Sequence, residues 1–113
     1  MPKTVLGTFT SRKIEQEMVD AVWYMRDWKG DNTEVVKVED MHGVRMNVLL
    51  HGNHIATWWP RTNTHTCGKL EVNEVTLRIW PSNTTISRLR ALGADIRVDR
   101  GTVLLDNIGV AER

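Results

Sequence analysis

The segment that most constrains the fold is a predicted β-hairpin at residues 45–59, RMNVLLHGNHIATWW. Apolar and polar residues alternate on both sides of Gly52 and Asn53, and two-residue loops of Gly and Asn favour turns that match strand twist. With the turn at Gly52 and Asn53, His51 and His54 lie directly opposite each other, with Cβ atoms about 5 Å apart. The hairpin therefore predicts a β-rich fold and brings two titratable side chains together.

This register also assigns the two faces of the hairpin. One face is apolar, is expected to pack on a helix, and comprises Met46, Val48, Leu50, Ile55, Thr57 and Trp59. The opposite face comprises Asn47, Leu49, His51, His54, Ala56 and Trp58. A shift of one residue would exchange the two faces, because side chains alternate along a strand.

Hydrophobic periodicity predicts two helices. Apolar residues recur at helical spacing over residues 11–29, with Gly30 as the stop, and over residues 84–92, where Thr84 or Thr85 caps the first turn. The charged and polar residues assigned to the outer faces of these helices are Arg12, Glu15, Gln16, Asp20, Asp27, Arg88 and Arg90.

Alternating patterns predict the remaining strands, at residues 33–38 and 75–80, and a second hairpin over residues 95–105 that turns at 99–101. Shorter strands are expected at residues 3–9, 61–66 and 108–110. Together these elements predict a single α+β domain over residues 1–113. Its mostly antiparallel sheet has five to seven strands, with an N-terminal helix and a short second helix.

The composition excludes several classes of protein. Hydrophobic residues make up 41% of the chain, which is enough for a packed core, and no apolar run reaches the roughly 20 residues that span a bilayer. The one cysteine, Cys67, cannot form an internal disulfide, as suits a reducing compartment. We therefore expect a soluble, cytoplasmic protein with no membrane partner and no cofactor.

The charge balance argues against a dedicated nucleic-acid-binding protein. Fifteen Lys and Arg residues face 14 Asp and Glu, which leaves no broad basic footprint. The alternative is a nucleic-acid-binding module in which the second helix and the following hairpin present Arg88, Arg90 and Arg97. Acidic residues in the same half of the chain offset these arginines, so nucleic acid is the less favoured partner.

Four residues of the types that bind zinc follow the spacing H-x2-H-x10-H-x-C, and they are His51, His54, His65 and Cys67. The pattern matches no standard zinc module, and histidines beside a turn also have a plain structural role. Cys67 beside His51 or His54 is the corresponding candidate for a thiol-dependent enzyme. No sequence feature indicates that this thiol is activated, so we expect a protein that is not an enzyme.

The surplus of tryptophan favours a protein interface, because Trp, Tyr and Arg dominate binding hot spots. The chain has five Trp against one Phe and one Tyr. A sheet covered by helices on one side leaves an open face, and its expected interface residues are Asn47, His51, His54, Trp58, Arg78 and Trp80. A foreign protein or complex is the expected occupant, and a second copy of the chain is the alternative.

Two motifs carry a resemblance to a known group of proteins. The hairpin motif is Leu50-His51-Gly52-Asn53-His54-Ile55-Ala56, preceded by Asn32-Thr33 and Val35, and the later motif is Trp80-Pro81, Thr84-Thr85, Ser87-Arg88-Leu89 and Ala91-Leu92. Over about residues 32–105 the chain resembles small accessory proteins encoded by tailed bacteriophages and mobile elements. The stretch from Arg61 to Glu74 departs from the shorter linkage expected there.

The resemblance implies a phage accessory role in the cytoplasm of the host bacterial cell and transfers no catalytic residues. Combined with the small size, the near-neutral charge and the surplus tryptophan, it leads us to expect a protein that binds and inhibits a host protein or defence complex stoichiometrically.

Overall fold

The computed structural model describes residues 3–41, 43–60 and 68–112, and within these it is an α+β protein, as the sequence predicts. Five strands form one antiparallel sheet in chain order: β1 (Trp28–Gly30), β2 (Thr33–Asp40), β3 (Gly43–Leu50), β4 (Asn53–Trp59) and β5 (Lys69–Val72). A second sheet contains β6 (Ile96–Asp99), β7 (Thr102–Leu105) and β8 (Ile108–Glu112). The described helices are α1 (Lys13–Trp23), α2 (Glu74–Ile79) and α3 (Asn83–Ala91).

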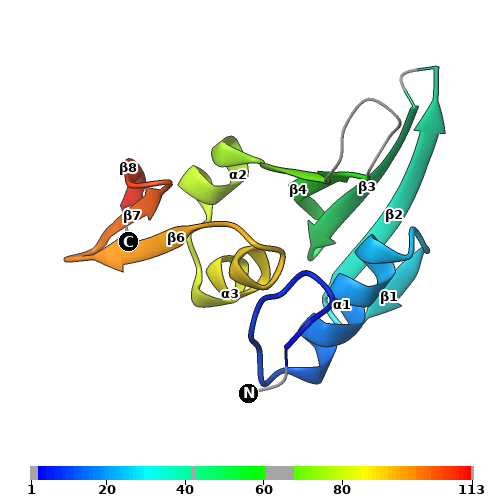
Figure 1. Cartoon of the computed structure of the whole chain (residues 1–113). Coiled ribbons are helices and arrows are strands. Elements are labelled where there is room, and N and C mark those ends of the chain that lie inside the picture. Colours follow the sequence, from blue (N-terminus) through cyan, green and yellow to red (C-terminus); the bar gives the residue numbers. More distant parts are fainter. Residues whose placement is uncertain (1–2, 42, 61–67, 113) are drawn as a thin grey trace.

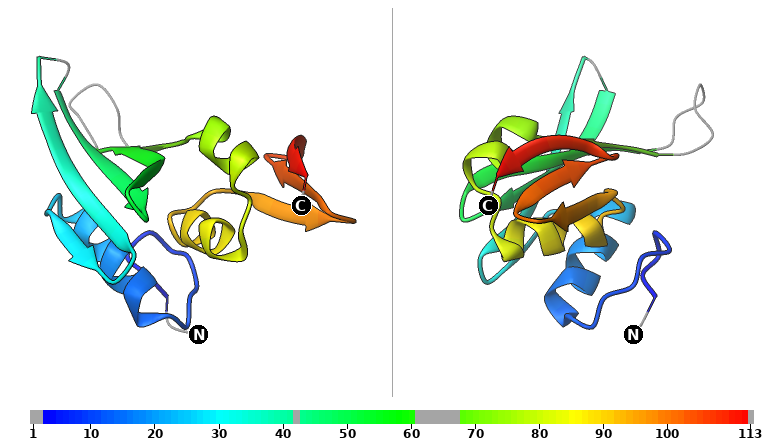
Figure 2. Two further views of the ribbon diagram at one scale, coloured as in Figure 1. Left: turned by 180° about the vertical axis from the view of Figure 1, so that it is seen from behind. Right: turned by 90° about the vertical axis from the view of Figure 1, so that its left-hand side faces the viewer.

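The two sheets lie at opposite ends of the molecule, with α2 and α3 between them (Figure 1). The turned views in Figure 2 show the same order, and both helices contact β4 on one side and the smaller sheet on the other. The helix α1 packs on β1, β2 and α3. Buried apolar side chains from both sheets and from α1, α2 and α3 form one core cluster, so the smaller sheet shares its core with the larger one.

The first helix is shorter than its periodicity predicts. It ends at Trp23, and the chain then reverses through Met25, which has a left-handed φ of 56°. The N–H groups of Met25 and Arg26 donate to the carbonyl oxygens of Val22 and Ala21, which is the pattern of a Schellman stop. Gly30 is therefore not the helix stop that the sequence predicts, and it belongs to β1.

The hairpin is present, but its turn is one residue earlier than predicted. Leu50 pairs with Asn53, and His51 and Gly52 occupy the turn with φ values of 52° and 80°, as in a type I′ turn. A β-bulge at Ile55 then shifts the register, so that Val48 pairs with Ala56 and Met46 with Trp58. The predicted opposition of His51 and His54 is therefore wrong, because His54 pairs with Leu49.

The segment predicted as a strand at residues 75–80 is instead the helix α2 and its C-cap. Asn73 caps the helix, because its side-chain oxygen accepts a hydrogen bond from the Thr76 N–H. The helical backbone places Leu77 inside, whereas Val75 and Ile79 point outward. A strand would have put all three side chains on one face.

The C-terminal half otherwise follows the prediction. The second helix is α3, and β6 and β7 form the second hairpin, which turns at Arg100 and Gly101. The last predicted strand is β8. The segment at residues 3–9 forms only a bridge between Lys3 and Phe9, and the strand predicted at residues 61–66 lies outside the described residues.

Candidate functional site

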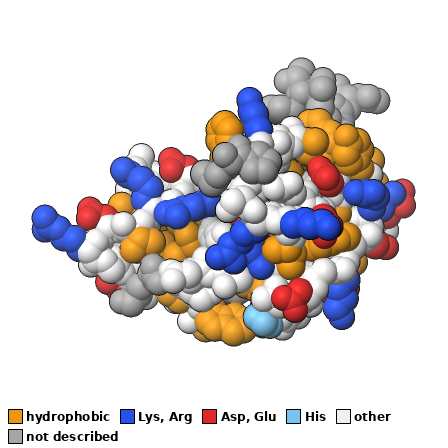
Figure 3. Space-filling model, turned by 90° about the horizontal axis from the view of Figure 1, so that it is seen from below, with side chains coloured by type: hydrophobic (Ala, Val, Ile, Leu, Met, Phe, Trp, Pro, Cys, Tyr) orange, Lys and Arg blue, Asp and Glu red, His pale blue; other side chains and the backbone are white. Residues whose placement is uncertain are grey.

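Large hydrophobic side chains reach the surface at several places, and Figure 3 shows separate hydrophobic patches on one face of the molecule. The exposed members are Val5, Phe9, Trp23, Tyr24, Met25, Met41, Val75, Ile79, Trp80, Val98 and Ile108. Two groups are contiguous in the chain. One follows the end of α1, and the other lies along α2 and its C-cap.

The second group lies along α2 and its C-cap, and together with its neighbouring side chains we call this strip the α2 surface. It comprises Val75, Arg78, Ile79, Trp80 and the adjacent His51. Val75 and Ile79 are four residues apart, so they are neighbours on the outer side of the helix, and Ile79 is 77% exposed. Arg78 lies on the same helix and donates from Nε to the carbonyl oxygen of Val110, which ties α2 to β8.

The ring of Trp80 joins this strip to the β3–β4 turn. The ring centroids of His51 and Trp80 are 6.1 Å apart and the rings are tilted by 44°. A cavity of about 230 Å³ lies beside them, lined by Leu50, His51, Trp80, Ser82, Thr84 and Thr85. Two of the predicted interface residues, His51 and Trp80, therefore do meet, and Arg78 lies two residues before Trp80 in the chain.

The prediction that Trp58 lies on an open face is wrong. Trp58 is 8% exposed, and its ring packs so closely on Gly68 that a Cβ there would lie 2.1 Å from Trp58 Cζ2. The shift of the turn alone would leave Val48 opposite Ile55 and keep the predicted faces, but the bulge at Ile55 exchanges the faces of β4 from Ala56 onward. Trp59 takes the outer position instead, where the Arg45 guanidinium lies 5.6 Å from its ring centroid.

Asn47 and His54 lie on this outer face, where they take part in a hydrogen-bond network within the protein. Asn73 donates to His54 Nδ1 at 3.0 Å, which leaves the His54 Nε2 hydrogen to bond to Thr57 Oγ1 at 2.7 Å. Thr57 Oγ1 in turn donates to Asn47 Oδ1. Because Asn73 is also the N-cap of α2, His54 fixes the place where α2 begins.

Sequence reasoning missed Val75 and Ile79, because a strand at residues 75–80 places them on the face opposite Arg78 and Trp80. The signal that identifies the helix is local. Asn73 is a favoured N-cap residue, and Glu74 places a negative charge in the first helical turn. Alternating apolar residues at 75, 77 and 79 fit a strand, but 75 and 79 also fit one side of a helix.

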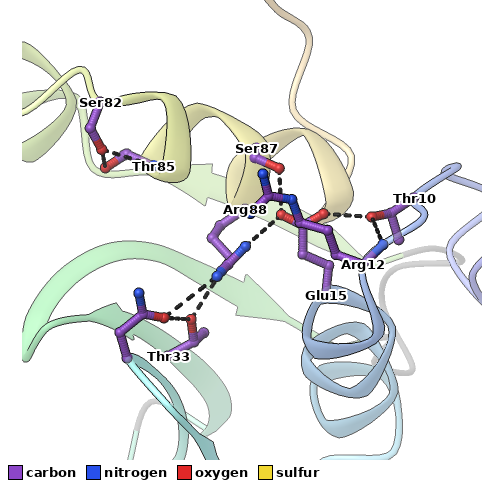
Figure 4. Close-up of polar contacts among 9 residues, drawn as sticks. Thr10, Arg12, Glu15, Thr33, Ser82, Thr85, Ser87 and Arg88 are labelled. Carbon is purple, nitrogen blue, oxygen red and sulfur yellow. Dashed lines mark hydrogen bonds and ion pairs between the residues drawn. The ribbon is translucent and has the colours of Figure 1, made fainter.

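A buried polar network lies between α1 and α3 (Figure 4). Arg88 Nη1 lies 2.7 Å from Glu15 Oε2, and the two residues are 3% and 2% exposed. Ser87 and Thr10 each donate a hydroxyl hydrogen to the Glu15 carboxylate at 2.5 Å. Arg88 Nε donates to Thr33 Oγ1, and so the network links both helices to β2.

The assignment of Glu15 and Arg88 to outer helix faces is therefore wrong. Burial raises the pKa of Glu15. The hydrogen bonds from Ser87, Thr10 and Arg88, together with the charge of Arg88, lower this pKa by more than burial raises it, so the net pKa is below its usual value. A carboxylate with a lowered pKa is a poor general base for the Ser87 hydroxyl, because a base works best with a pKa near the working pH. The arrangement suits an internal ion pair that orients the two helices.

The nucleic-acid alternative loses its central residue, because the buried and paired Arg88 has no access to a phosphate backbone. Arg90 and Arg97 are exposed. Arg90 Nε donates to the carbonyl oxygen of Ile96, and Arg97 donates to Asn107 Oδ1. Arg90 therefore links α3 to β6, and Arg97 links β6 to the turn that follows β7.

The metal alternative falls partly outside the described residues, which exclude His65 and Cys67. Of the other two ligands, His51 stacks near Trp80 and His54 has both ring nitrogens in hydrogen bonds. Within residues 3–41, 43–60 and 68–112, no group of three or more His, Cys, Asp or Glu side chains is placed to hold a metal ion.

Comparison with known proteins adds one finding. A protein-family model described as Kyanoviridae Gp96 protein matches residues 11–109. No curated protein and no solved structure matches the chain. None of the described helices is long and apolar enough to cross a membrane.

Proposed function

We propose that this chain binds a host protein or complex and blocks it stoichiometrically. The chain belongs to the Kyanoviridae Gp96 family of phage proteins, because that family model matches most of its length. The observation that carries the proposal is the α2 surface. It combines exposed apolar side chains and an arginine of α2 with an aromatic pair that Trp80, at the end of the helix, forms with His51 of the β3–β4 turn.

Helix formation does not account for the residues on this surface. Val and Ile lose side-chain freedom in a helix, so neither stabilises a helix whose outer side faces water. Their exposed apolar area also gains nothing from burial within this chain. Exposed apolar groups of this kind mark interaction surfaces, and Trp and Arg are the residues that contribute most at the centres of such surfaces.

The shape of the surface also supports a protein partner. Trp80 is 43% exposed and borders a cavity of about 230 Å³, so a partner side chain can enter beside the ring. Ile79 and Val75 extend the apolar strip away from that cavity along α2. A cavity next to an apolar strip with a polar rim is the usual anatomy of a protein interface.

The chain provides a matched control for testing this surface. Trp23 is 42% exposed, compared with 43% for Trp80, but it ends α1 and does not belong to the α2 surface. Tagged wild-type, Trp80→Ala and Trp23→Ala proteins would be used to capture partners from host lysate. A captured protein would then be purified and titrated against each variant, with its activity and the mass of the complex measured.

We expect wild type and Trp23→Ala to capture the same host protein, to form a complex of fixed stoichiometry and to inhibit it, whereas Trp80→Ala loses at least tenfold in affinity, about 1.4 kcal/mol. Equal capture by all three variants would refute the role of the α2 surface. Complex formation that leaves the partner's activity unchanged would refute inhibition.

A further inference from the structure

The strand β5 forms one edge of the five-stranded sheet and pairs only with β4 among the described strands. The pairing continues one residue further, since the Asn73 N–H donates to the Ile55 carbonyl oxygen at 2.8 Å. In an antiparallel pair the hydrogen-bonded positions alternate, so Lys69, Glu71 and Asn73 bond toward β4. The N–H and C=O groups of Leu70 and Val72 consequently point away from the sheet, along an edge with which no other described strand pairs.

A groove of about 540 Å³ runs along this edge. All four consecutive residues of β5 line it, and because neighbouring side chains point to opposite faces, such a groove follows the strand edge and not one face. The opposite wall comes from the connection between α3 and β6 and from the end of β7. The residues of that wall are Gly93, Ala94, Asp95, Leu105 and Asp106, and Glu74 is also part of the lining.

The groove is negatively charged. Four carboxylates line it, those of Glu71, Glu74, Asp95 and Asp106, and Lys69 is the one cation among its lining residues. The Lys69 ammonium lies 3.8 Å from the Glu71 carboxylate, so its charge is already offset by its own strand. Leu70, Val72, Ala94 and Leu105 supply apolar surface between the charges.

We propose that this edge binds an extended, basic segment of a protein partner as an added β-strand. The inference rests on the proposed function, in that the chain binds a protein, and it names the chemistry of the bound segment. Backbone groups of the segment pair with the free N–H and C=O groups of Leu70 and Val72, which is how strand addition supplies affinity. Lys or Arg side chains of the segment face the carboxylates, and the alternate apolar side chains contact Leu70 and Val72.

The charge decides between two kinds of extended polymer. Single-stranded nucleic acid is also extended, but its phosphates would lie beside the four carboxylates and would be repelled. An acidic peptide is excluded for the same reason. A basic peptide is attracted by the same groups, and the free edge offers the main-chain hydrogen bonds that a nucleic acid cannot complete.

The experiment uses short labelled peptides that alternate Lys and Val, and measures binding to the whole chain by fluorescence anisotropy. One control peptide replaces each Lys by Glu. A second control keeps every side chain but is N-methylated at alternate backbone positions, which removes the donors that a paired strand needs. On the protein side, Glu74→Gln/Asp106→Asn removes two charges from the groove, and Asp99→Asn/Glu112→Gln removes two exposed charges outside it.

We expect the Lys–Val peptide to bind, the groove variant to bind it about tenfold more weakly, and the matched variant to bind it as wild type does. The Glu–Val and N-methylated peptides should not bind. Equal binding of the N-methylated peptide would overturn strand addition, and equal weakening by both protein variants would overturn the groove as the site. A Trp80→Ala protein should bind the peptide normally, so failure of the α2 surface and failure of the groove give different results.

Discussion

The internal ion pair gives the sharpest test of how the two helices are held. The change is Glu15→Gln, which keeps the size and shape of the side chain and removes its charge. Gln still offers an oxygen to Ser87 and Arg88, and its amide can donate to Thr10 Oγ1 in place of the bond that Thr10 now donates. The substitution therefore isolates the charge of the carboxylate, and leaves Arg88 as a buried cation without a counter-ion.

The expected cost follows from burial. Glu15 and Arg88 are 2% and 3% exposed, and removing one partner of a buried ion pair costs about 3–5 kcal/mol. Arg88 keeps two other acceptors, Thr33 Oγ1 at 3.0 Å and Asn32 Oδ1 at 3.5 Å, which places the cost near the lower end. We therefore expect a loss of about 3 kcal/mol, which lowers Tm by roughly 12 °C in a domain of this size.

The matched control is Glu17→Gln, which makes the same change on the same helix. Glu17 pairs with Lys13 at 4.0 Å on the surface, where such pairs contribute less than about 0.5 kcal/mol. Urea unfolding would be measured for Glu15→Gln, Glu17→Gln, Arg88→Met and the Glu15→Gln/Arg88→Met double variant. If Glu15→Gln cost no more than Glu17→Gln, or if the two single effects simply added in the double variant, the ion pair would not couple the helices as argued.

Three further predictions concern stability. Glu15 stays ionised in the folded chain at pH values where the unfolded chain binds a proton, so its contribution to the free energy of unfolding is complete above about pH 4.3 and is lost as the pH falls further. Urea titrations at several pH values should therefore show a smaller loss of stability in acid for Glu15→Gln than for the wild type. A Cβ at Gly30 would lie 2.4 Å from the Trp28 ring, compared with 3.5 Å from a methyl group at Gly109, so Gly30→Ala should cost about 1–3 kcal/mol in thermal unfolding and Gly109→Ala much less. Trp58→Ala should cost about 3 kcal/mol or more in chemical unfolding because the ring is buried, and a cost below 1 kcal/mol would contradict its place in the core.

Local patterns in the sequence predict the elements of this fold better than their register. Alternation identifies both hairpins, because each pattern depends on residues a few positions apart. The first turn is displaced because the sequence His51-Gly52-Asn53 suits two turn types, one with Gly in the first position and one with Gly in the second. The bulge at Ile55 then brings Ala56 and Trp58 to the core side, opposite Val48 and Met46, and no short-range pattern reveals a bulge.

The buried ion pair was beyond sequence reasoning for a different reason. Glu15 and Arg88 are 73 residues apart in the chain, and each carries a charge that helical periodicity assigns to solvent. Only the packing of α1 against α3 brings them together and removes them from water. The same separation explains the candidate site, where His51 and Trp80 come from distant segments and meet because α2 is held against β4.

The two proposed binding surfaces depend on one structural device at the start of α2. Asn73 accepts the hydrogen bond that caps α2, donates to His54, and continues the pairing of β5 with β4 through its N–H. Glu74, on the next position, belongs to the groove, and Val75 begins the apolar strip of the α2 surface. A partner strand added to β5 would therefore end beside α2, where a single protein can contact the groove and the α2 surface together. Two modest contacts on one rigid body gain from each other's proximity, so the groove and the α2 surface together would bind one partner more tightly than either surface alone.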